Sequence, residues 1–402
     1  MKKNIITLAL LFVYFNGIIF YLIPQLGFLT IWDEVVTIVL MAFCVLKLFK
    51  TKKGKILVNN DFKFLFPWIL IVFSGLIGNG IYKYAASVQA IFRDVVVFLK
   101  FPICFFAIRY LKIDMKMDRV IKTYFLNVIH FIIYGISICA IISLFFDIGM
   151  SQMEEVRHGI HSFKFLFNHP NSFGIVMVMI LCLLNSVDEY ESQKKYIILC
   201  LFLLVLTMRT KILAFCAVFI FIKFGNRWAK KFKGLFIFGS SALILATVYD
   251  KLTIVTKWSE SARMRFWTES FNLLLKCFPL GTGFATFASH ISGKYKSSLY
   301  SILNIKEIFD QYGNVTATIG DTGFPYYIGQ FGFFGLCMLF LSIRALLKII
   351  HNENFDSTSA VLFLTYIAIA LTGEATLINA GLECAVTLSL ILRSDKKVSS
   401  NK

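Results

Sequence analysis

Long apolar stretches recur from one end of the chain to the other and are separated by short polar connections, as around residues 5–23, 64–77 and 361–371. A helix of about 20 apolar residues crosses the hydrocarbon layer of a bilayer. The pattern therefore predicts an all-α, polytopic membrane protein with about twelve transmembrane helices. The expected spans lie near residues 4–23, 31–49, 64–80, 92–109, 124–146, 170–187, 195–208, 212–224, 234–250, 324–346, 359–373 and 379–393.

Composition supports a membrane protein over a soluble one. Apolar residues make up 58% of the chain and charged residues only 16%, whereas about 25% is typical of soluble domains. This balance excludes a soluble enzyme and a disordered tail. The first apolar stretch follows only three residues and lacks a small-residue cleavage site, so we expect it to be retained as a span. Residues 1–402 are expected to form a single integral membrane domain.

Charge predicts the orientation. The formal net charge is +18, which by itself suggests a nucleic-acid partner. However, 26 of the 41 Lys and Arg residues and only 9 of the 23 Asp and Glu residues fall in alternate connections of the twelve-span arrangement, together with both termini. The basic side of a membrane protein is cytoplasmic. Both termini are therefore expected in the cytoplasm, with the excess charge facing anionic lipid and no nucleic-acid partner.

One connection is much longer than the rest. Residues 251–322, between the ninth and tenth spans, form a large loop that the orientation places outside. Its segment 261–278 (SARMRFWTESFNLLLKCF) predicts an amphipathic helix with Phe266, Phe271, Leu274 and Leu275 on one side. A Gly-rich turn, PLGTGFATF at 279–287, follows. Long ordered loops are usually functional; a solvated tether is the alternative.

A turn at residues 208–211 divides the apolar stretch 196–224. If the stretch formed one span, every later segment would face the opposite side of the membrane, and the later basic connections would lie outside. Two short spans keep these basic connections in the cytoplasm. At about 1.5 Å per residue, each of the two spans is shorter than the hydrocarbon layer is thick. The turn is therefore expected to lie in a recess below the outer surface, where Arg209 and Lys211 would be hydrated or would hold an anion.

Arg209 is the strongest candidate functional residue, because its guanidinium can bind a phosphate with two parallel hydrogen bonds. Lys211 is a second candidate. Alternatively, Arg209 has no function and only extends its charged group from a helix end to the membrane surface. In the long loop, Arg263 or Arg265 could pair with Arg209 to hold a diphosphate; contact with lipid headgroups would also explain both. No DxD-like metal motif appears, so we expect neither a metal ion nor another cofactor.

Further candidates stand at expected helix ends. His169 and Asn171 flank Pro170 at the start of the sixth span, with Arg157 upstream, and helix capping explains this motif equally well. Asp321, at the outer start of the tenth span, is either a helix cap or a general base for a sugar hydroxyl.

Lys100 lies within the fourth span and is a functional candidate by default, although a carboxylate from another span would also explain it. Glu374 and Glu383, near the last outer turn, could pair with these cations, and the sequence does not decide between them.

Taken in order, these motifs resemble the superfamily of O-antigen ligases and Wzy-type polysaccharide polymerases, over most of the chain. TMRTK at 207–211 is similar to the family's Ser-Arg-Thr turn, with Met208 in place of Ser. SARMRFW at 261–267 resembles its Arg-x-x-x-Trp element, which selects Arg263 over Arg265. PLGTGF at 279–284, GDTGFPYYIGQFGFFG at 320–335 and HPNSFG at 169–174 resemble three further family segments.

The resemblance implies glycosyl transfer at the outer face of the bacterial cytoplasmic membrane. The donor would be a glycan on undecaprenyl diphosphate, whose diphosphate Arg209 and Arg263 would contact. Family ligases carry a His near the place of Asp321, and this chain does not. We therefore expect a metal-independent, inverting polymerase that adds the glycan to a second lipid-linked repeat unit, with Asp321 or His169 as any base. A chain-length regulator and a flippase are the implied protein partners.

The substrate suggests where the glycan would bind, and two rival functions stay open. Five tyrosines could line an external glycan cavity: Tyr295, Tyr300, Tyr312, Tyr326 and Tyr327. One rival is ligase-like transfer to another acceptor. The other is a flippase or transporter of lipid-linked oligosaccharides, although such proteins usually consist of two similar halves and no internal match is found here.

Overall fold

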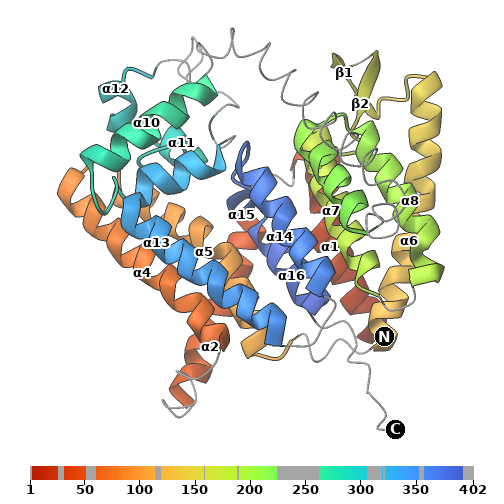
Figure 1. The fold of residues 1–402 in the computed structure, drawn as a ribbon, viewed down its shortest axis with the longest axis horizontal. Coiled ribbons are helices and arrows are strands. Elements are labelled where there is room, and N and C mark those ends of the chain that lie inside the picture. Colours follow the sequence, from red (N-terminus) through yellow and green to blue (C-terminus); the bar gives the residue numbers. More distant parts are fainter. Residues whose placement is uncertain are drawn as a thin grey trace.

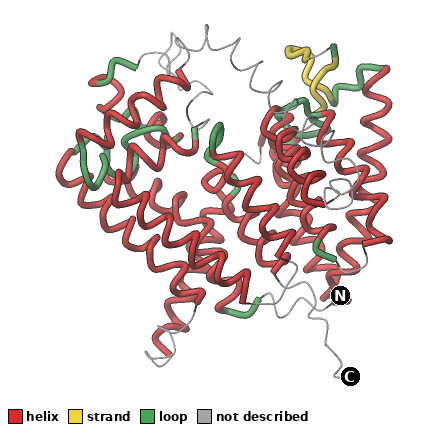
Figure 2. Tube along the Cα trace, in the orientation of Figure 1, coloured by secondary structure: helices red, strands yellow, loops and turns green. Residues whose placement is uncertain are grey.

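The computed structural model describes residues 2–25, 31–50, 60–113, 119–157, 159–187, 190–223, 262–305, 319, 322–352 and 357–392. These residues form a helical bundle with one small hairpin (Figures 1 and 2). The elements are α1 (Lys2–Leu22), α2 (Trp32–Lys50), α4 (Asn60–Tyr82), α5 (Val88–Tyr110), α6 (Arg119–Phe145), β1 (Ser151–Arg157), β2 (Ile160–Phe163), α7 (Pro170–Asn185), α8 (Tyr190–Leu206), an unlabelled helix over 210–223, α10 (Ala262–Lys276), α11 (His290–Lys294), α12 (Ser298–Ile302), α13 (Gly323–Asn352), α14 (Ser357–Leu371), α15 (Thr376–Asn379) and α16 (Gly381–Leu392).

Helices stand at eleven of the twelve expected spans, and the ninth, 234–250, lies outside the described residues. Four described helices are long and apolar enough to cross a membrane: Asn4–Leu22, Asn60–Tyr82, Tyr124–Phe145 and Gly323–His351. Pro170–Asn185, Thr358–Leu371 and Gly381–Leu392 are apolar but shorter. The protein is thus a predominantly helical bundle whose longest helices have the length and composition of membrane spans.

The sequence did not predict the antiparallel hairpin of β1 and β2. The two strands begin six residues after α6, and Ser151 pairs with Phe163. The register shifts between Gln152 and Val156, so the hairpin lacks a strict alternation of buried and exposed residues. It lies over the start of α7, at the upper right of Figure 1.

The first and last described helices run antiparallel. The hydroxyl groups of Tyr14 and Thr387 lie 2.9 Å apart, and Nδ2 of Asn16 lies 3.3 Å from Oε1 of Glu383. Rising residue numbers in α1 therefore match falling numbers in α16. The chain enters α1 and leaves α16 at the same end of the bundle (Figure 1).

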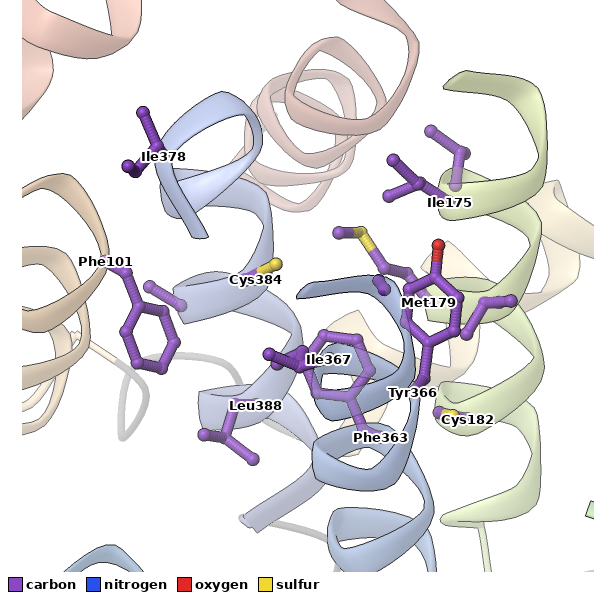
Figure 3. Close-up of a cluster of buried hydrophobic side chains, with 14 of the residues drawn as sticks. Phe101, Ile175, Met179, Cys182, Phe363, Tyr366, Ile367, Ile378, Cys384 and Leu388 are labelled. Atoms are coloured by element: carbon purple, nitrogen blue, oxygen red, sulfur yellow. The ribbon is translucent and has the colours of Figure 1, made fainter. Parts of the chain in front are cut away.

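The core consists of side chains from helices that are distant in sequence. Figure 3 shows Met179 of α7, Phe363 and Tyr366 of α14, Cys384 of α16 and Phe101 of α5 in one buried cluster. The α14 helix thus packs between α7 and α16 and joins the two sides of the bundle.

The described part of the long loop is packed internally, and its helix α10 also contacts α13. Phe266 of α10 is fully buried against Phe287 and Tyr300. The buried side of α10 continues through Ser270 and Leu273. The predicted apolar side was therefore wrong.

Of the four residues predicted for the apolar side of α10, Phe266 is buried and Leu274 is half-buried, whereas Phe271 and Leu275 are exposed. The helix is apolar on two sides, and only one packs on the protein.

Candidate functional site

Two helices begin side by side at one end of the bundle. His169 is the N-cap of α7, with Pro170 as its first helical residue. Arg209 precedes the helix over 210–223, and its carbonyl accepts the first α-helical hydrogen bond, from Leu213 N–H at 2.9 Å. The first turns are in close contact, because a Cβ on Gly174 would lie 2.0 Å from Cδ1 of Ile212. The predicted division of the stretch 196–224 is therefore present.

The Arg209 side chain spans these two helix starts. Its Nη2 donates to Oε1 of Gln152 in β1 at 2.8 Å and lies 3.4 Å from Nε2 of His169. The residue is half-buried, and so is His169. The hairpin, α7 and the turn after α8 thus place three polar side chains together.

The hydrogen bonding of His169 determines what its ring can bind. Its Nδ1 accepts the backbone N–H of Asn171 at 3.1 Å. A neutral imidazole carries one proton, so the ring then has its N–H at Nε2. Nε2 and the Arg209 guanidinium are therefore both donors, and an oxyanion placed between them could accept from both.

Lys211 and Asn171 complete the cluster through a shared carboxylate. Nζ of Lys211 and Nδ2 of Asn171 both donate to Oε2 of Glu374, which follows α14. The sequence left the partner of Glu374 open, and the structure assigns it to Lys211. Oδ1 of Asn171 is buried without a hydrogen-bond partner among the described residues.

The electrostatics of this Arg209 cluster (Gln152, His169, Asn171, Arg209, Lys211 and Glu374) favour an anion. The guanidinium and the ammonium carry two positive charges, against one carboxylate. Each helix start adds a partial positive charge of about half an elementary unit, together with backbone N–H groups. Among the described residues, the cluster therefore has the properties of a site for a phosphate or diphosphate.

Three of the predicted site residues are not described in full. Asp321 and the side chains of Arg157 and Arg263 lie outside the described part of the structure. The backbone of Arg157 ends β1, and that of Arg263 is in the first turn of α10. Nη2 of Arg265 donates to the carbonyl of Leu303 at 3.2 Å, a hydrogen bond within the long loop.

A chain of contacts joins α10 to the Arg209 cluster. Trp267, one helical turn after Arg263, packs on Phe324 with ring centroids 6.1 Å apart. The preceding Gly323 lies against the Glu374 turn, because a Cβ there would be 2.7 Å from the Glu374 carbonyl oxygen. The helix that carries Arg263 is therefore linked through the start of α13 to the residue that binds Lys211.

The Gly-rich turn after α10 has a structural role. It enters a break in α13 at Gly332, where Gly283 N–H donates to the Gln330 carbonyl at 2.9 Å. Gly281 has a φ of +78°, and a Cβ there would lie 2.5 Å from backbone atoms of Gln330 and Gly332. Side chains do not fit between two backbones this close.

A polar side chain holds the same turn from α4. Asn79 donates through Nδ2 to the Phe284 carbonyl and accepts the Phe284 N–H at Oδ1, both at 2.8 Å. Asp94 of α5 is fully buried and accepts the Ala285 N–H at 2.7 Å. The turn therefore fixes the long loop on α4, α5 and α13.

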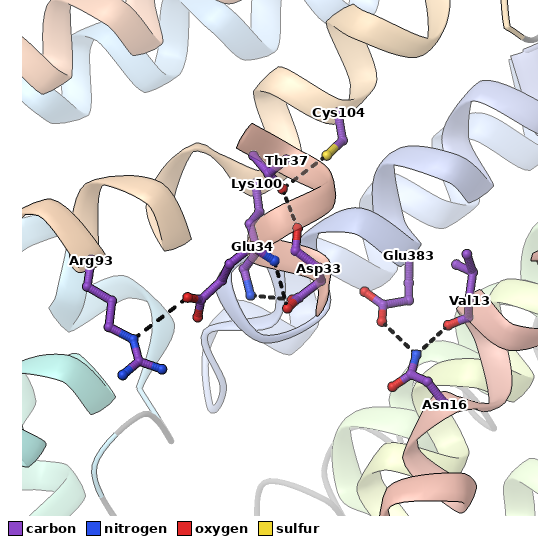
Figure 4. Close-up of polar contacts among 9 residues, drawn as sticks. All are labelled: Val13, Asn16, Asp33, Glu34, Thr37, Arg93, Lys100, Cys104 and Glu383. Carbon is purple, nitrogen blue, oxygen red and sulfur yellow. Dashed lines mark hydrogen bonds and ion pairs between the residues drawn. The ribbon is translucent and has the colours of Figure 1, made fainter. Parts of the chain in front are cut away.

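Lys100 belongs to a different polar group, shown in Figure 4. Its Nζ forms a buried ion pair with Oδ2 of Asp33 in α2 at 2.6 Å. Beside it, Arg93 faces Glu34 at 3.7 Å, and Glu383 of α16 accepts from Asn16 of α1. Lys100 thus has the carboxylate partner from another helix that the sequence allowed as an alternative to function.

An apolar cavity of about 320 Å³ lies between α4, α5, α13 and α14. Phe324, Leu371 and Leu377 line it near the Glu374 turn, and Phe64 and Leu346 line it further along the bundle. The cavity therefore runs from the neighbourhood of the Arg209 cluster along the apolar faces of the helices.

The tyrosines expected to line a glycan cavity are mostly buried. Tyr300, Tyr326 and Tyr327 are exposed by 3% or less, and Tyr295 is half-buried. Burial raises the pKa of Tyr300 above its usual value, so its hydroxyl keeps its proton and bonds to Ser292. Tyr312 lies outside the described residues. The prediction was therefore wrong for the three buried rings, which pack in the core.

The sequence analysis missed Gln152, because the hairpin that carries it has no clear alternation of apolar and polar residues.

Among the described residues, no group of three or more His, Cys, Asp or Glu side chains could hold a metal ion. No family model, no curated protein and no solved structure matches the chain.

Proposed function

We propose that this protein is a membrane glycosyltransferase, a polysaccharide polymerase that transfers a glycan from undecaprenyl diphosphate to the end of another lipid-linked repeat unit. The single observation that carries the proposal is the meeting of Arg209 and His169 at two adjacent helix starts, where their donors suit a phosphate oxygen. The motif order described above supplies the substrate class. The twelve-span arrangement, with both termini in the cytoplasm of a bacterium and the site at the outer face of the cytoplasmic membrane, is part of the proposal.

The proposed reaction is a direct displacement. The acceptor hydroxyl oxygen forms a bond to the anomeric carbon of the donor, and the bond from that carbon to the diphosphate oxygen breaks. The hydroxyl proton passes to a base, and undecaprenyl diphosphate leaves with the additional negative charge. A single displacement of this kind inverts the configuration of the anomeric carbon.

In this reaction Arg209 would hold the diphosphate and stabilise the charge that develops as it leaves. His169 suits the same role better than that of a base, because its Nδ1 accepts a backbone N–H and leaves Nε2 as a donor. Asp321 is then the candidate base.

Arg263, one turn before Trp267 in α10, is proposed as the second diphosphate ligand. Lys211 and Asn171 would position the site through Glu374.

The isoprenoid chain of the donor also needs a path through the bundle. The apolar cavity between α4, α13 and α14 begins near the Glu374 turn and is lined by aromatic and aliphatic side chains. We assign this cavity to part of the isoprenoid chain of the donor. The diphosphate would then lie at the bundle end and the lipid along the helices.

Transport of lipid-linked oligosaccharides is the second candidate function. The ion pairs Lys100–Asp33 and Arg93–Glu34, which cross between α2 and α5, favour it, because ionisable groups between spans often line transport pathways.

Purified protein in liposomes, supplied with short lipid-linked repeat units and no nucleotide, tests both functions. Polymer ladders are the expected result, and Arg209→Lys should reduce their yield about 100-fold. The matched control is Lys276→Arg, a charge-conserving change in an exposed lysine of α10. Repeat units that cross the membrane unchanged, without ladders, would refute the polymerase and support the transporter.

A further inference from the structure

A second recess lies between α4 and α13, away from the Arg209 cluster. It has a volume of about 410 Å³, and its lining includes Asn60 and Lys63 of α4 and Arg344 and Lys348 of α13. The α13 positions are four residues apart and share one face of the helix with Leu341 and Ala345. Two helix faces therefore bring three cationic side chains around one hollow.

The recess has an excess of positive charge. Arg344, Lys348 and Lys63 have no ion pair with a carboxylate among the described residues, and no carboxylate lines the recess. The nearest acidic residue in α4, Asp61, binds Arg109 of α5 at 2.6 Å. Three like charges around a hollow repel one another unless an anion lies between them.

Contacts beside the recess hold its two walls in place. Nε1 of Trp68 donates to the Ser342 hydroxyl at 2.6 Å, and this hydroxyl donates to the Phe64 carbonyl at 3.1 Å. Both bonds join α4 to α13 about one turn from the cations. The spacing of the cations on the two helices is therefore fixed by buried hydrogen bonds.

The surroundings indicate a lipid as the source of the anion. Large apolar side chains next to the recess are turned outward: Phe66 is 47% exposed, and Leu347 is 47% exposed. Leu341, which lines the recess itself, is also exposed. A phosphate in the hollow would have apolar surface beside it, as a phospholipid with its acyl chains requires.

The position along the bundle agrees with a headgroup at the membrane surface. Gly323, the first residue of α13, lies beside the Glu374 turn, whereas Arg344 stands 12 residues after the break at Gly332, in the second part of the helix. The recess and the Arg209 cluster therefore lie toward opposite ends of α13, and at opposite membrane faces if the helices span.

We propose that the recess of Lys63, Arg344 and Lys348 binds the phosphate of an anionic phospholipid headgroup. The cations bind the phosphate, the Asn60 amide contacts the polar part of the headgroup, and the acyl chains lie along Phe66, Leu341 and Leu347. The site is separate from the proposed polymerase chemistry, and its occupancy does not require lipid-linked glycan.

Native mass spectrometry of the full-length protein tests the site directly. The protein is exchanged into detergent and titrated with phosphatidylglycerol, with phosphatidylcholine and with soluble glycerol phosphate. The wild-type protein should retain one phosphatidylglycerol molecule in preference to phosphatidylcholine. The triple variant Lys63→Gln/Arg344→Gln/Lys348→Gln should bind it on the order of 10- to 100-fold more weakly.

The matched control removes the same charge elsewhere. Lys276→Gln/Lys294→Gln/Lys296→Gln changes three exposed lysines of the long-loop segment and should leave binding unchanged. Single variants at Arg344 and Lys348, each expected to weaken binding, cover the case in which the triple variant does not fold. Equal retention of the two lipids, or equal loss in both triple variants, would overturn the proposal. Binding of glycerol phosphate as tightly as of phosphatidylglycerol would overturn the assignment to a lipid.

Discussion

Nη2 of Arg209 lies 3.4 Å from Nε2 of His169, although the two residues are 40 positions apart in the chain. Each residue directly precedes a helix, so two helix starts, a guanidinium and an imidazole N–H face one region. Few ligands other than an oxyanion satisfy such a set of donors. This pair is the physical basis of the proposed diphosphate site.

Lys211 and Glu374 should be strongly coupled, because each neutralises the other where Glu374 is buried and Lys211 is largely covered. We expect Lys211→Ala and Glu374→Ala each to lower the free energy of unfolding in mixed micelles. The double variant should be less destabilised than the sum, with a coupling energy of about 0.5–3 kcal/mol. Lys211→Ala combined with Glu269→Ala, a carboxylate on α10, is the control and should be additive. If the effects of Lys211→Ala and Glu374→Ala are additive, the ion pair does not contribute to stability.

Gly281→Ala should destabilise the protein by about 2–4 kcal/mol, since it places a side chain at positive φ and against the backbone of α13. Thermal unfolding of the detergent-solubilised protein measures this. Gly80→Ala is the matched control, because a Cβ at Gly80 meets nothing within 4 Å and the residue is helical. Its unfolding temperature should stay the same or rise slightly. Similar behaviour of the two variants would contradict the tight docking of the Gly-rich turn.

Lys100→Met should be costly, because it leaves Asp33 charged and without its ammonium partner inside the bundle. The expected loss is about 3–5 kcal/mol. Asp33→Asn/Lys100→Met should recover most of this loss and retain polymer synthesis. A stable double variant without activity would instead assign Lys100 to the function.

The helix positions could be predicted from the sequence because apolar stretches of span length are a strong local signal. The turn at Arg209 was also predictable, since its two charged residues interrupt one such stretch. The packed side of α10 was not, because Phe271 and Leu275 are as apolar as Phe266 and only tertiary contacts show which of them is buried.

The partners of the candidate residues were the least predictable part. Lys100 pairs with Asp33, which is 67 positions away in the chain, and Lys211 pairs with Glu374, which is 163 positions away. No local pattern specifies such pairs. Gln152 could not be found either, since its hairpin lacks a regular alternation and the residue itself carries no charge.

The binding of an isoprenyl diphosphate by purified protein tests the central claim most directly, without dependence on the glycan or the acceptor. Wild-type protein and Lys276→Arg, a charge-conserving change in an exposed residue of α10, should bind it equally in microscale thermophoresis. Arg209→Lys should lose roughly 10- to 100-fold in affinity, because it keeps the charge but loses the two-pronged hydrogen bonding of the guanidinium. Wild-type affinity in both Arg209→Lys and Arg209→Ala would contradict the claim that Arg209 holds the lipid diphosphate.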